Sequence, residues 1–395
     1  MMDKPSRDLE WEKDMLGLFV HDHRFPKVES EYYHSYGFDE EFFNRYLSIF
    51  DKMAVIGREY NFKISSGDKA EKVQPDIEFL TILDLKQLKN KDIRDMINQK
   101  IKNSDYLVIR VPSILGLYAV RMAQQYKKPY LIEVVGCPWD AIANKGLTKI
   151  IPAAAITHLT KKAIRTSKYT VYVTEEFLER RYPTNGKYIA CSNVTLNSVD
   201  DNFLSKRLEQ IDKLEPNKII LGTCATVDVI YKGQQDVIAA IAKLKDEGYY
   251  IEYQLVGGGD TSYLKSIAQK YGVAEQVEFV GSLKHEDVFK WLEQIDIYVH
   301  PSKQEGLSRA IIEAMSKGCP IFGADAGGIH ELIDDDYIFD KGNIQQIYDI
   351  FKSFNQKTMK EQAEENQKNS KKYLKSVLYK RRNGFFKEFI GENNI

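Results

Sequence analysis

The chain has 395 residues, which is more than one ordinary domain needs and predicts two cores of roughly 180 to 200 residues each. Hydrophobic residues make up 43% and charged residues 29% of the sequence, a composition that excludes a disordered or low-complexity chain. The formal net charge of −1 excludes a nucleic-acid binder that acts through a strongly basic surface.

Cysteine usage and the first residues indicate where the protein works. Cys137, Cys191, Cys224 and Cys319 are far apart and form no C-x-x-C pair, which favours a reducing, cytoplasmic compartment. The opening MMDKPSRDLEWEKDM has no apolar signal-peptide core, and the sequence contains no window of about eighteen apolar residues. We therefore expect a protein that is neither exported nor membrane-spanning.

The first half alternates short apolar runs with helix-like segments. The runs are MLGLFV, KMAVIG, DIEFLTI, DYLVIRV, PYLIEVV, YTVYVT and KYIACS. Residues 40–50 and the stretch ILGLYAVRMAQQYKK have apolar residues at helical spacing. This alternation predicts βαβ units and a parallel, doubly wound sheet.

The pattern breaks in the polar stretch NSVDDNFLSKRLEQIDKLEPN and then starts again at KIILGTCA. We therefore expect an α/β protein with two doubly wound, Rossmann-like domains at residues 1–205 and 206–374, facing each other across a cleft, and a final helical segment at 375–395. Sheets of this kind bind ligands at the carboxyl ends of their strands, so the cleft is the expected site.

The stretch HPSKQEGLSRAIIEAM, residues 300–315, joins a strand end, a loop and a helix that opens near Ser308. Unpaired backbone N–H groups of Leu307, Ser308 and Arg309 would form an anion site at the positive end of the helix. Glu305 would lie in the turn and Glu313 about a turn and a half inside the helix. Two carboxylates flanking a phosphate site suggest sugar hydroxyls on either side of a diphosphate.

The two glutamates also have a plainer interpretation, in which Glu305 is a charge at the end of the helix and Glu313 belongs to a solvated face. Neighbouring motifs decide between this interpretation and a ligand site. Gly327 and Gly328 in IFGADAGGIHELI would let backbone approach a ligand beside the same loop. Lys232 in YKGQQDVIAAI precedes a helix, where it could meet the same phosphates. Together with LVGGGD, these motifs favour a ligand site.

The run YKG, LVGGGD, VEFVGSLKHEDVFKWL and DIYVHPSKQEGLSRAIIEAMSKGCPIFGADAGGIHEL resembles the donor domain of retaining glycosyltransferases with the GT-B fold, family 4. It looks most like the bacterial members that assemble capsular and surface polysaccharides. The strong match covers roughly residues 218–335. The two-glutamate motif is specific, whereas LVGGGD alone would be weak.

The resemblance implies a role for each matching residue. Glu313 would bind the ribose hydroxyls, Glu305 would hold hydroxyls of the transferred sugar, and Lys232 would neutralise the leaving diphosphate. Backbone at Gly306, Leu307 and Ser308 would cradle the distal phosphate, and the turn Gly281, Ser282, Leu283 would line the base. No metal cofactor is expected, because Lys232 and the helix N-terminus would take the role of a divalent cation.

Two positions depart from the family pattern. Thr226 stands where members usually have an arginine, and Gly136 stands where they often have a histidine after an apolar strand. Arg309, and Arg110 at the end of DYLVIRV, are candidate substitutes for the missing charge.

Two further clusters are candidates for a metal site or an acceptor site. His21 and Asp22 in HDHRF lack further metal ligands nearby and are instead candidates for a wall that faces the acceptor. Asp334, Asp335 and Asp336 follow a helix start and are interpreted as an exposed turn.

In the segment from 375 onward, large apolar residues leave one helical face that needs a partner, and the resemblance implies that this helix packs back on the first domain.

The segment NKGLTKIIPAAAITHLTKKAIRTSKY has six basic side chains and no acidic one. It is either an ordinary helix with a basic face or a surface that rests on anionic lipid.

The resemblance thus predicts a cytoplasmic, metal-independent retaining glycosyltransferase, peripheral at the inner face of the membrane if that surface binds lipid. It would move a sugar from a nucleotide-diphosphate donor, in the first instance a UDP-sugar, to a glycan or polyprenyl-linked acceptor, with no nucleic-acid partner. Two alternatives stay open: a nucleotide-sugar epimerase or phosphorylase of similar architecture, and an inactive nucleotide-sugar-binding partner.

Overall fold

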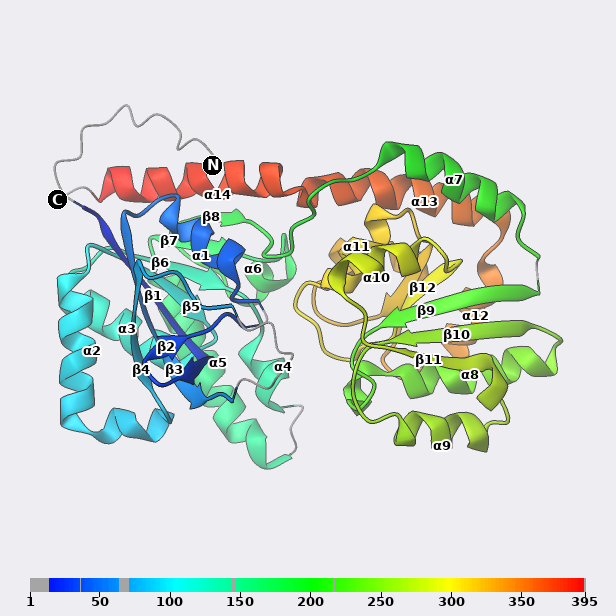
Figure 1. Cartoon of the computed structure of the whole chain (residues 1–395), viewed down its shortest axis with the longest axis horizontal. Coiled ribbons are helices and arrows are strands. Elements are labelled where there is room, and N and C mark those ends of the chain that lie inside the picture. The colour runs from blue at the N-terminus through cyan, green and yellow to red at the C-terminus, as the bar shows by residue number, and fades with distance from the viewer. Residues whose placement is uncertain (1–13, 36, 64–70, 144–146, 216, 394–395) are drawn as a thin grey trace. The chain divides into compact units, whose positions relative to one another are not determined.

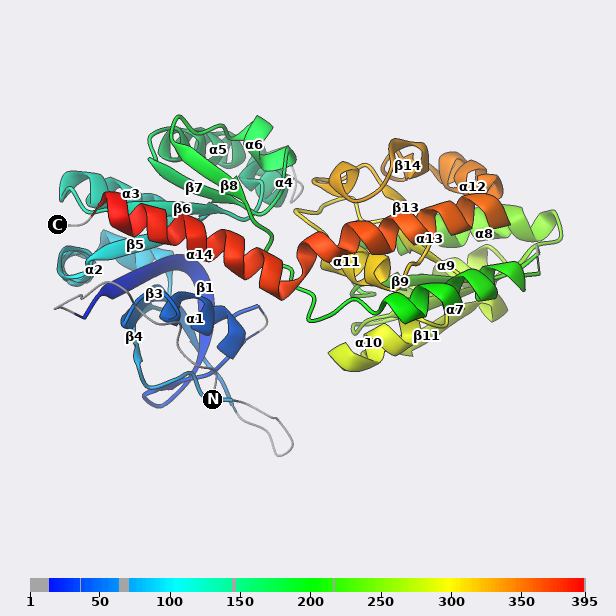
Figure 2. The ribbon, with the colours of Figure 1, turned by 90° about the horizontal axis from the view of Figure 1, so that it is seen from above.

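The computed structural model describes residues 14–35, 37–63, 71–143, 147–215 and 217–393, and it divides the chain into two compact units. Unit 1 comprises the chain up to Val173, Leu178–Cys191 and the part from Tyr379 onward. Unit 2 comprises Thr174–Phe177 and Ser192–Leu378. Each unit is built around its own sheet (Figures 1 and 2).

Unit 1 contains an eight-stranded sheet in the order β4-β3-β1-β5-β6-β7-β8, with β2 antiparallel to β1 and every other pairing parallel. The strands are β1 (Leu16–Val28), β2 (Glu31–Tyr32), β3 (Lys52–Asn61), β4 (Ile77–Ile82), β5 (Tyr106–Val111), β6 (Tyr130–Val134), β7 (Tyr169–Tyr172) and β8 (Lys187–Ala190). The α-helices are α1 (Glu40–Leu47), α2 (Lys91–Asn103), α3 (Ile114–Gln125), α4 (Pro138–Ala143), α5 (Ile150–Arg165), α6 (Phe177–Arg181) and most of α14 (Lys375–Glu392), with short 3₁₀ turns at Leu85–Lys89 and Leu147–Lys149.

Unit 2 contains a six-stranded, fully parallel sheet in the order β11-β10-β9-β12-β13-β14. The strands are β9 (Lys218–Cys224), β10 (Tyr250–Val256), β11 (Val277–Gly281), β12 (Ile297–His300), β13 (Ile321–Ala324) and β14 (Ile338–Phe339). The α-helices are α7 (Asp201–Asp212), α8 (Gln234–Asp246), α9 (Ser262–Lys270), α10 (His285–Leu292), α11 (Arg309–Ser316), α12 (Ile344–Ser353) and α13 (Gln356–Ser370). Short 3₁₀ turns lie at Ile230–Lys232, Ala274–Gln276, Ile329–Glu331, Asp335–Tyr337 and Lys371–Tyr373.

The central strands explain why the sequence adopts this fold. Every residue of β5 and of β12 is buried, which is the pattern of strands covered by helices on both faces. Such strands appear in the sequence as continuous apolar runs. The helix between two strands carries the chain back across the sheet, so that the next strand runs parallel to the first. The predicted fold class, α/β with two doubly wound domains, is confirmed.

The polar stretch in which the domain boundary is expected contains a helix, α7. Phe203, Arg207 and Ile211 recur at four-residue spacing and are buried on one side of this helix. The guanidinium of the buried Arg207 donates to the backbone carbonyls of Ile295 and Leu292, both at 2.6 Å. These contacts place α7 in unit 2, so the chain changes unit at Cys191/Ser192, earlier than the expected residue 205.

The end of the chain returns to unit 1. The change of unit lies between Leu378 and Tyr379, four residues later than the expected boundary between 374 and 375. Phe385, Phe386 and Phe389 of α14 are buried against aromatic side chains of this unit. Val377, in the first turn of α14, remains 39% exposed and takes no part in that contact. No helix in the described ranges is long and apolar enough to cross a bilayer.

Candidate functional site

The strand order of unit 2 marks one place as the expected ligand site. From β9 the chain proceeds to β10 and β11 on one side, and from β12 to β13 and β14 on the other. The loops that follow β9 and β12 therefore diverge at the carboxyl edge of the sheet, and such a switch point is where doubly wound sheets bind ligands. The first loop carries Lys232 and the second carries Glu305.

Lys232 and Glu305 meet across this switch point. Nζ of Lys232 lies 2.8 Å from Oε1 of Glu305, and Nε2 of the buried His300 lies 3.2 Å from the same oxygen. Burial raises the pKa of Glu305, but the neighbouring His300 and Lys232 outweigh that effect and lower it to about 2. Glu305 is therefore ionised at neutral pH.

Glu313 forms a second charged pair at the same edge. It lies inside α11 with 5% of its side chain exposed, and its Oε1 is 2.8 Å from Nε2 of His285 at the start of α10. Nη1 of Arg309 is 3.9 Å from the same oxygen. The hydrogen bond with Glu313 raises the pKa of His285 above its usual value. The buried carboxylate of Glu313 thus has an imidazole and a guanidinium beside it.

Helix α11 begins where the sequence predicts it. Ser308 is the N-cap, and its hydroxyl accepts the N–H of Ile311 at 3.4 Å. Within the described chain, the N–H groups of Leu307, Ser308 and Arg309 donate to no other residue. Three backbone donors at the positive end of a helix, next to Lys232, form a suitable place for an anion.

The glycine turn of GGIHEL packs on the Glu305 loop. Gly327 has φ +61°, and a Cβ atom there would lie 2.1 Å from the carbonyl oxygen of Glu305. The N–H of Gly328 donates to the carbonyl of Gly306 at 2.8 Å. These glycines bring backbone against the loop that carries Glu305, so the turn fixes the shape of that loop.

Comparisons with known proteins agree with this geometry. Residues 208–373 match the family model described as glycosyl transferases group 1. The chain is 35% identical to the protein CapJ of Staphylococcus aureus over 340 residues, which cover 84% of both chains. The chain belongs to the glycosyl transferases group 1 family.

Solved structures show the same fold at low sequence identity. HepE (Alr3699) of Anabaena in complex with UDP matches with a TM-score of 0.67 and 15% identity, over 95% of this glycosyltransferase and 100% of that chain. Sucrose-phosphate synthase of Thermosynechococcus elongatus matches with a TM-score of 0.68 and 13% identity, over 96% and 100%. The resemblance inferred from the motifs is confirmed at the level of family and fold.

The other positions that the sequence predicts for a donor site lie at the same edge of unit 2. Gly281 ends β11, and Ser282 and Leu283 form the turn that leads to α10 and His285. Thr226 is exposed in the loop that also carries Lys232, and the side-chain amide of Gln234 donates to its carbonyl at 3.0 Å. The structure thus brings all the predicted donor residues of unit 2 to one edge of its sheet.

In unit 1, His21 and Asp22 lie within β1 and not at its end. The register of β1 with β3 shifts between Val20 and Arg24, so these residues form a bulge. The Asp22 carboxylate accepts the N–H groups of Ile114 and Leu115, at 2.6 and 2.8 Å. Asp22 therefore fills the N-terminus of α3, a position at which an anionic ligand would otherwise bind.

Arg110 is buried and occupied by a partner. Its guanidinium donates to Oε2 of Glu133 at 2.8 and 3.1 Å, and the hydroxyl of Tyr46 donates to both oxygens of the same carboxylate at 2.9 Å. Burial raises the pKa of Glu133, but the charges of Arg110, Arg382 and Arg45 together outweigh that effect and lower the pKa below its usual value. Of the two candidate substitutes for the missing arginine, Arg309 belongs to unit 2 and lies 3.9 Å from Glu313, whereas Arg110 belongs to unit 1 and pairs with Glu133.

Two histidines of the site were missed by the sequence interpretation. His285 contacts Glu313 and His300 contacts Glu305. The available signal was position: His300 ends a buried strand at the carboxyl edge, and His285 opens the helix after the GSL turn. Within the described ranges, no three His, Cys, Asp or Glu side chains gather as a metal site.

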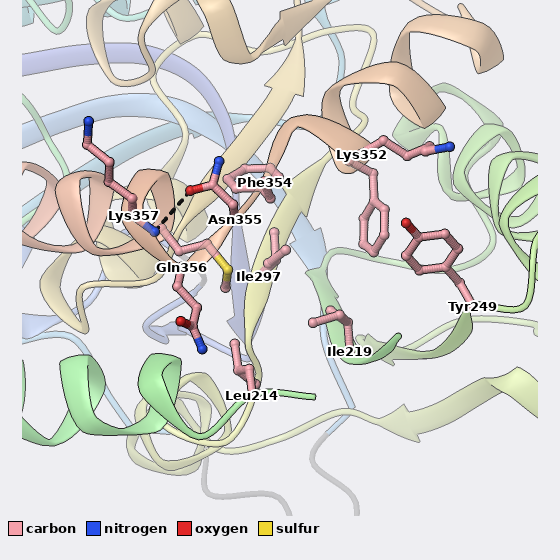
Figure 3. Close-up of a pocket in the computed structure, with 11 residues that line it drawn as sticks. Leu214, Ile219, Tyr249, Ile297, Lys352, Phe354, Asn355, Gln356 and Lys357 are labelled. Atoms are coloured by element: carbon pink, nitrogen blue, oxygen red, sulfur yellow. Dashed lines mark hydrogen bonds between the residues drawn. The ribbon is translucent and has the colours of Figure 1, made fainter. Parts of the chain in front are cut away.

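A pocket of about 540 Å³ lies elsewhere in unit 2 (Figure 3). Ile219 and Ile297, near the amino ends of β9 and β12, form part of its wall, so it lies at the edge of the sheet opposite to Lys232 and Glu305. The remaining lining residues come from the ends of α7, α12 and α13 and from the start of β10: Leu214, Tyr249, Phe351, Lys352, Phe354, Asn355, Gln356, Lys357 and Met359. None of the predicted site residues lines it.

Proposed function

We propose that this protein is a retaining glycosyltransferase that moves a sugar from a nucleotide-diphosphate sugar, in the first instance a UDP-sugar, to a glycan or polyprenyl-linked glycan in surface-polysaccharide assembly. The observation that carries the proposal is the pair of Lys232 and Glu305 at the switch point of unit 2, beside the N-terminus of α11 and within the same edge as Glu313.

Each group has a part in the proposed reaction. Glu313 accepts hydrogen bonds from the ribose, Glu305 accepts them from hydroxyls of the transferred sugar, and the N–H groups of residues 307–309 bind the distal phosphate. When the bond between the sugar and the diphosphate breaks, the leaving diphosphate gains negative charge. Lys232 and the helix N-terminus stabilise that charge, so we propose that no metal ion is needed.

The relatives support the donor and the biological setting. HepE of Anabaena was solved with UDP and with UDP-glucose. The amylovoran biosynthesis glycosyltransferase AmsK of Erwinia amylovora is 33% identical over 110 residues, which cover 26% of this chain and 27% of that one. Retention of configuration rests on the two-glutamate motif, which resembles that of retaining enzymes.

A thermal-shift screen of UDP-, GDP- and ADP-sugars tests the donor. A ligand at a hundred times its Kd adds about 2.7 kcal/mol to the free energy of unfolding. The hit is then incubated with glycan acceptors, with and without a chelator. Transfer that survives the chelator, with the new bond in the donor's anomeric configuration, supports the proposal. Isomerised donor without acceptor indicates an epimerase, and binding without turnover indicates an inactive partner.

A further inference from the structure

Helix α5 of unit 1 presents an unusual surface. From Ala141 to Thr174 the sequence contains six lysines and arginines and no aspartate or glutamate. Within the described chain, Lys149, Lys162 and Arg165 form no ion pair with any carboxylate, although ion pairs are frequent on the rest of the surface. The positive charge of this helix is therefore not neutralised by the protein itself.

Large apolar side chains are exposed on the same helix. Ile151 is 82% exposed, Leu159 51% and Ile150 41%. The buried side consists of Ala153, Thr160, Ala163 and Ile164, which are small or aliphatic and pack on the rest of unit 1. A single exposed leucine needs no explanation, but an isoleucine that is four-fifths exposed beside two other exposed aliphatic residues forms a patch.

The apolar and the basic residues share one face. Ile151, Ala155, His158 and Lys162 follow each other at spacings of four, three and four, and all are exposed, so they form a row on the side opposite the buried residues. Arg165 continues this row by three residues. The helix is therefore amphipathic in the sense of an interfacial helix: one face packs on the unit, and the other offers aliphatic groups at its start and cations toward its end.

The fold places the apolar start of α5 at a particular edge. Strand β6 precedes α5, strand β7 follows it, and the two strands are parallel, so α5 runs back across the sheet. The start of α5 thus lies toward the carboxyl edge of the sheet in unit 1, and Ile150 and Ile151 are the first residues of this helix. The bulge with His21 and Asp22 lies at the carboxyl end of the segment of β1 that pairs with β5.

We propose that the outward face of α5 docks on an anionic membrane surface, with Ile150 and Ile151 inserted among the acyl chains and Lys162 and Arg165 over the headgroups. Lipid matches this surface because a bilayer of anionic lipids takes up aliphatic and cationic groups side by side, whereas a polyanion such as nucleic acid would leave Ile151 in water. The docking itself does not depend on the proposed function. It would hold the carboxyl edge of unit 1 next to a polyprenyl-linked acceptor.

Vesicle co-sedimentation of the full chain tests this proposal. The vesicles contain either phosphatidylcholine alone or phosphatidylcholine with about 30% phosphatidylglycerol. Each basic residue near an anionic surface contributes roughly fivefold to partitioning. We expect binding only to the anionic vesicles, a steep decrease with salt, and at least tenfold weaker binding for the double variant Lys162→Glu, Arg165→Glu. Ile151→Ser should weaken binding several-fold and leave the salt dependence unchanged.

Matched controls distinguish vesicle binding by this face from a general effect of surface charge or of exposed apolar side chains. Lys206→Glu changes an exposed lysine on α7, and Met96→Ser removes a 53% exposed apolar side chain from α2. Both should bind vesicles like the unchanged chain, and all variants should keep its melting temperature. Equal binding to both kinds of vesicle, no binding to either, or α5 variants that bind like the controls would overturn the proposal. So would tighter binding to duplex DNA than to anionic vesicles. Loss of nucleotide binding with intact vesicle binding would instead count against the proposed function alone.

Discussion

Nζ of Lys232 and Oε1 of Glu305 are 2.8 Å apart, although 73 positions separate the two residues in the sequence. The pair lies across the switch point of the unit 2 sheet, because one partner follows β9 and the other follows β12. A diphosphate that attracts Lys232 would therefore also free an oxygen of Glu305 for sugar hydroxyls. In the proposed function, the binding of the two halves of the donor is coupled through this ion pair.

Replacing Lys232 by methionine should lower turnover more than donor binding. The ammonium matters most when the leaving diphosphate gains charge, so we expect kcat to fall by about 10²- to 10³-fold and the Kd for the donor to change by less than about tenfold. Steady-state kinetics together with calorimetry would show the difference. Lys317→Met is the control, because Lys317 is also a half-buried lysine in an ion pair, with Glu293, at the far end of α11. A loss confined to KM would contradict the role of Lys232 in the transition state.

Glu313→Gln should weaken binding of the free nucleotide, since ribose contacts form before any chemistry. Removing the charge from a buried, hydrogen-bonded carboxylate costs about 1.5 to 3 kcal/mol of interaction, which corresponds to roughly a ten- to hundred-fold increase in the Kd for UDP. Titration calorimetry measures it directly. Glu293→Gln, which removes the charge that pairs with Lys317, should leave the Kd unchanged. Equal affinities for the two variants would remove Glu313 from the site.

Much of this protein could be predicted from the sequence, because continuous apolar runs such as DYLVIRV and DIYVHPS identify buried parallel strands almost without ambiguity. The location of the donor-site residues followed from the same periodicity, since strand ends and helix starts fix where Lys232, Glu305 and Glu313 must lie. Helix α7 was not predicted. Its buried face contains an arginine at a position where an apolar residue would indicate a helix, so the apolar periodicity of this segment is interrupted.

Side-chain pairing could not be predicted, because it depends on contacts between loops far apart in the sequence. Arg110 at a strand end looked like a free cation, yet Glu133 on the neighbouring strand neutralises it. Asp22 looked like a ligand-facing acid, yet it caps α3, more than ninety residues away. Neither partner can be inferred from local spacing.

The pair of His285 with Glu313 should make stability depend on pH in a defined direction. The pKa of His285 is raised in the folded chain, so the pair contributes stability that is complete below the unfolded value of about 6.5 and is lost as the pH rises through the folded value. Urea unfolding of His285→Gln and the unchanged chain should therefore differ more at pH 5.5 than at pH 9. Because His285 is 60% exposed, we expect less than about 1 kcal/mol. An equal difference at the two pH values would mean that this pair does not contribute to stability.

Gly327→Ala should disturb the Glu305 loop specifically. The new methyl group would lie 2.1 Å from the Glu305 carbonyl oxygen, so the loop or the glycine turn must move. Gly248→Ala is a suitable control because Gly248 also has a positive φ, +88°, while its Cβ would meet nothing within 4 Å. Both variants carry the backbone strain of about 1 kcal/mol. Only Gly327→Ala should also lose transferase activity, by at least tenfold; equal activities would show that the position of this loop is unimportant.

The C-terminal helix should stabilise unit 1 although it is the last element of the chain. Phe386 is fully buried and lies near Tyr46 and Phe50, so Phe386→Ala should cost about 3 to 5 kcal/mol of unfolding free energy in this unit. Val377→Ala, in the same helix but 39% exposed, should stay within about 0.5 kcal/mol of the unchanged chain. A chain that ends at Leu378 removes only the part of α14 that belongs to unit 1. Limited proteolysis should then cut unit 1 rapidly, while calorimetry still detects UDP binding to unit 2 and transfer is abolished. A truncated chain with a protease-resistant unit 1 and full activity would show that the helix is dispensable.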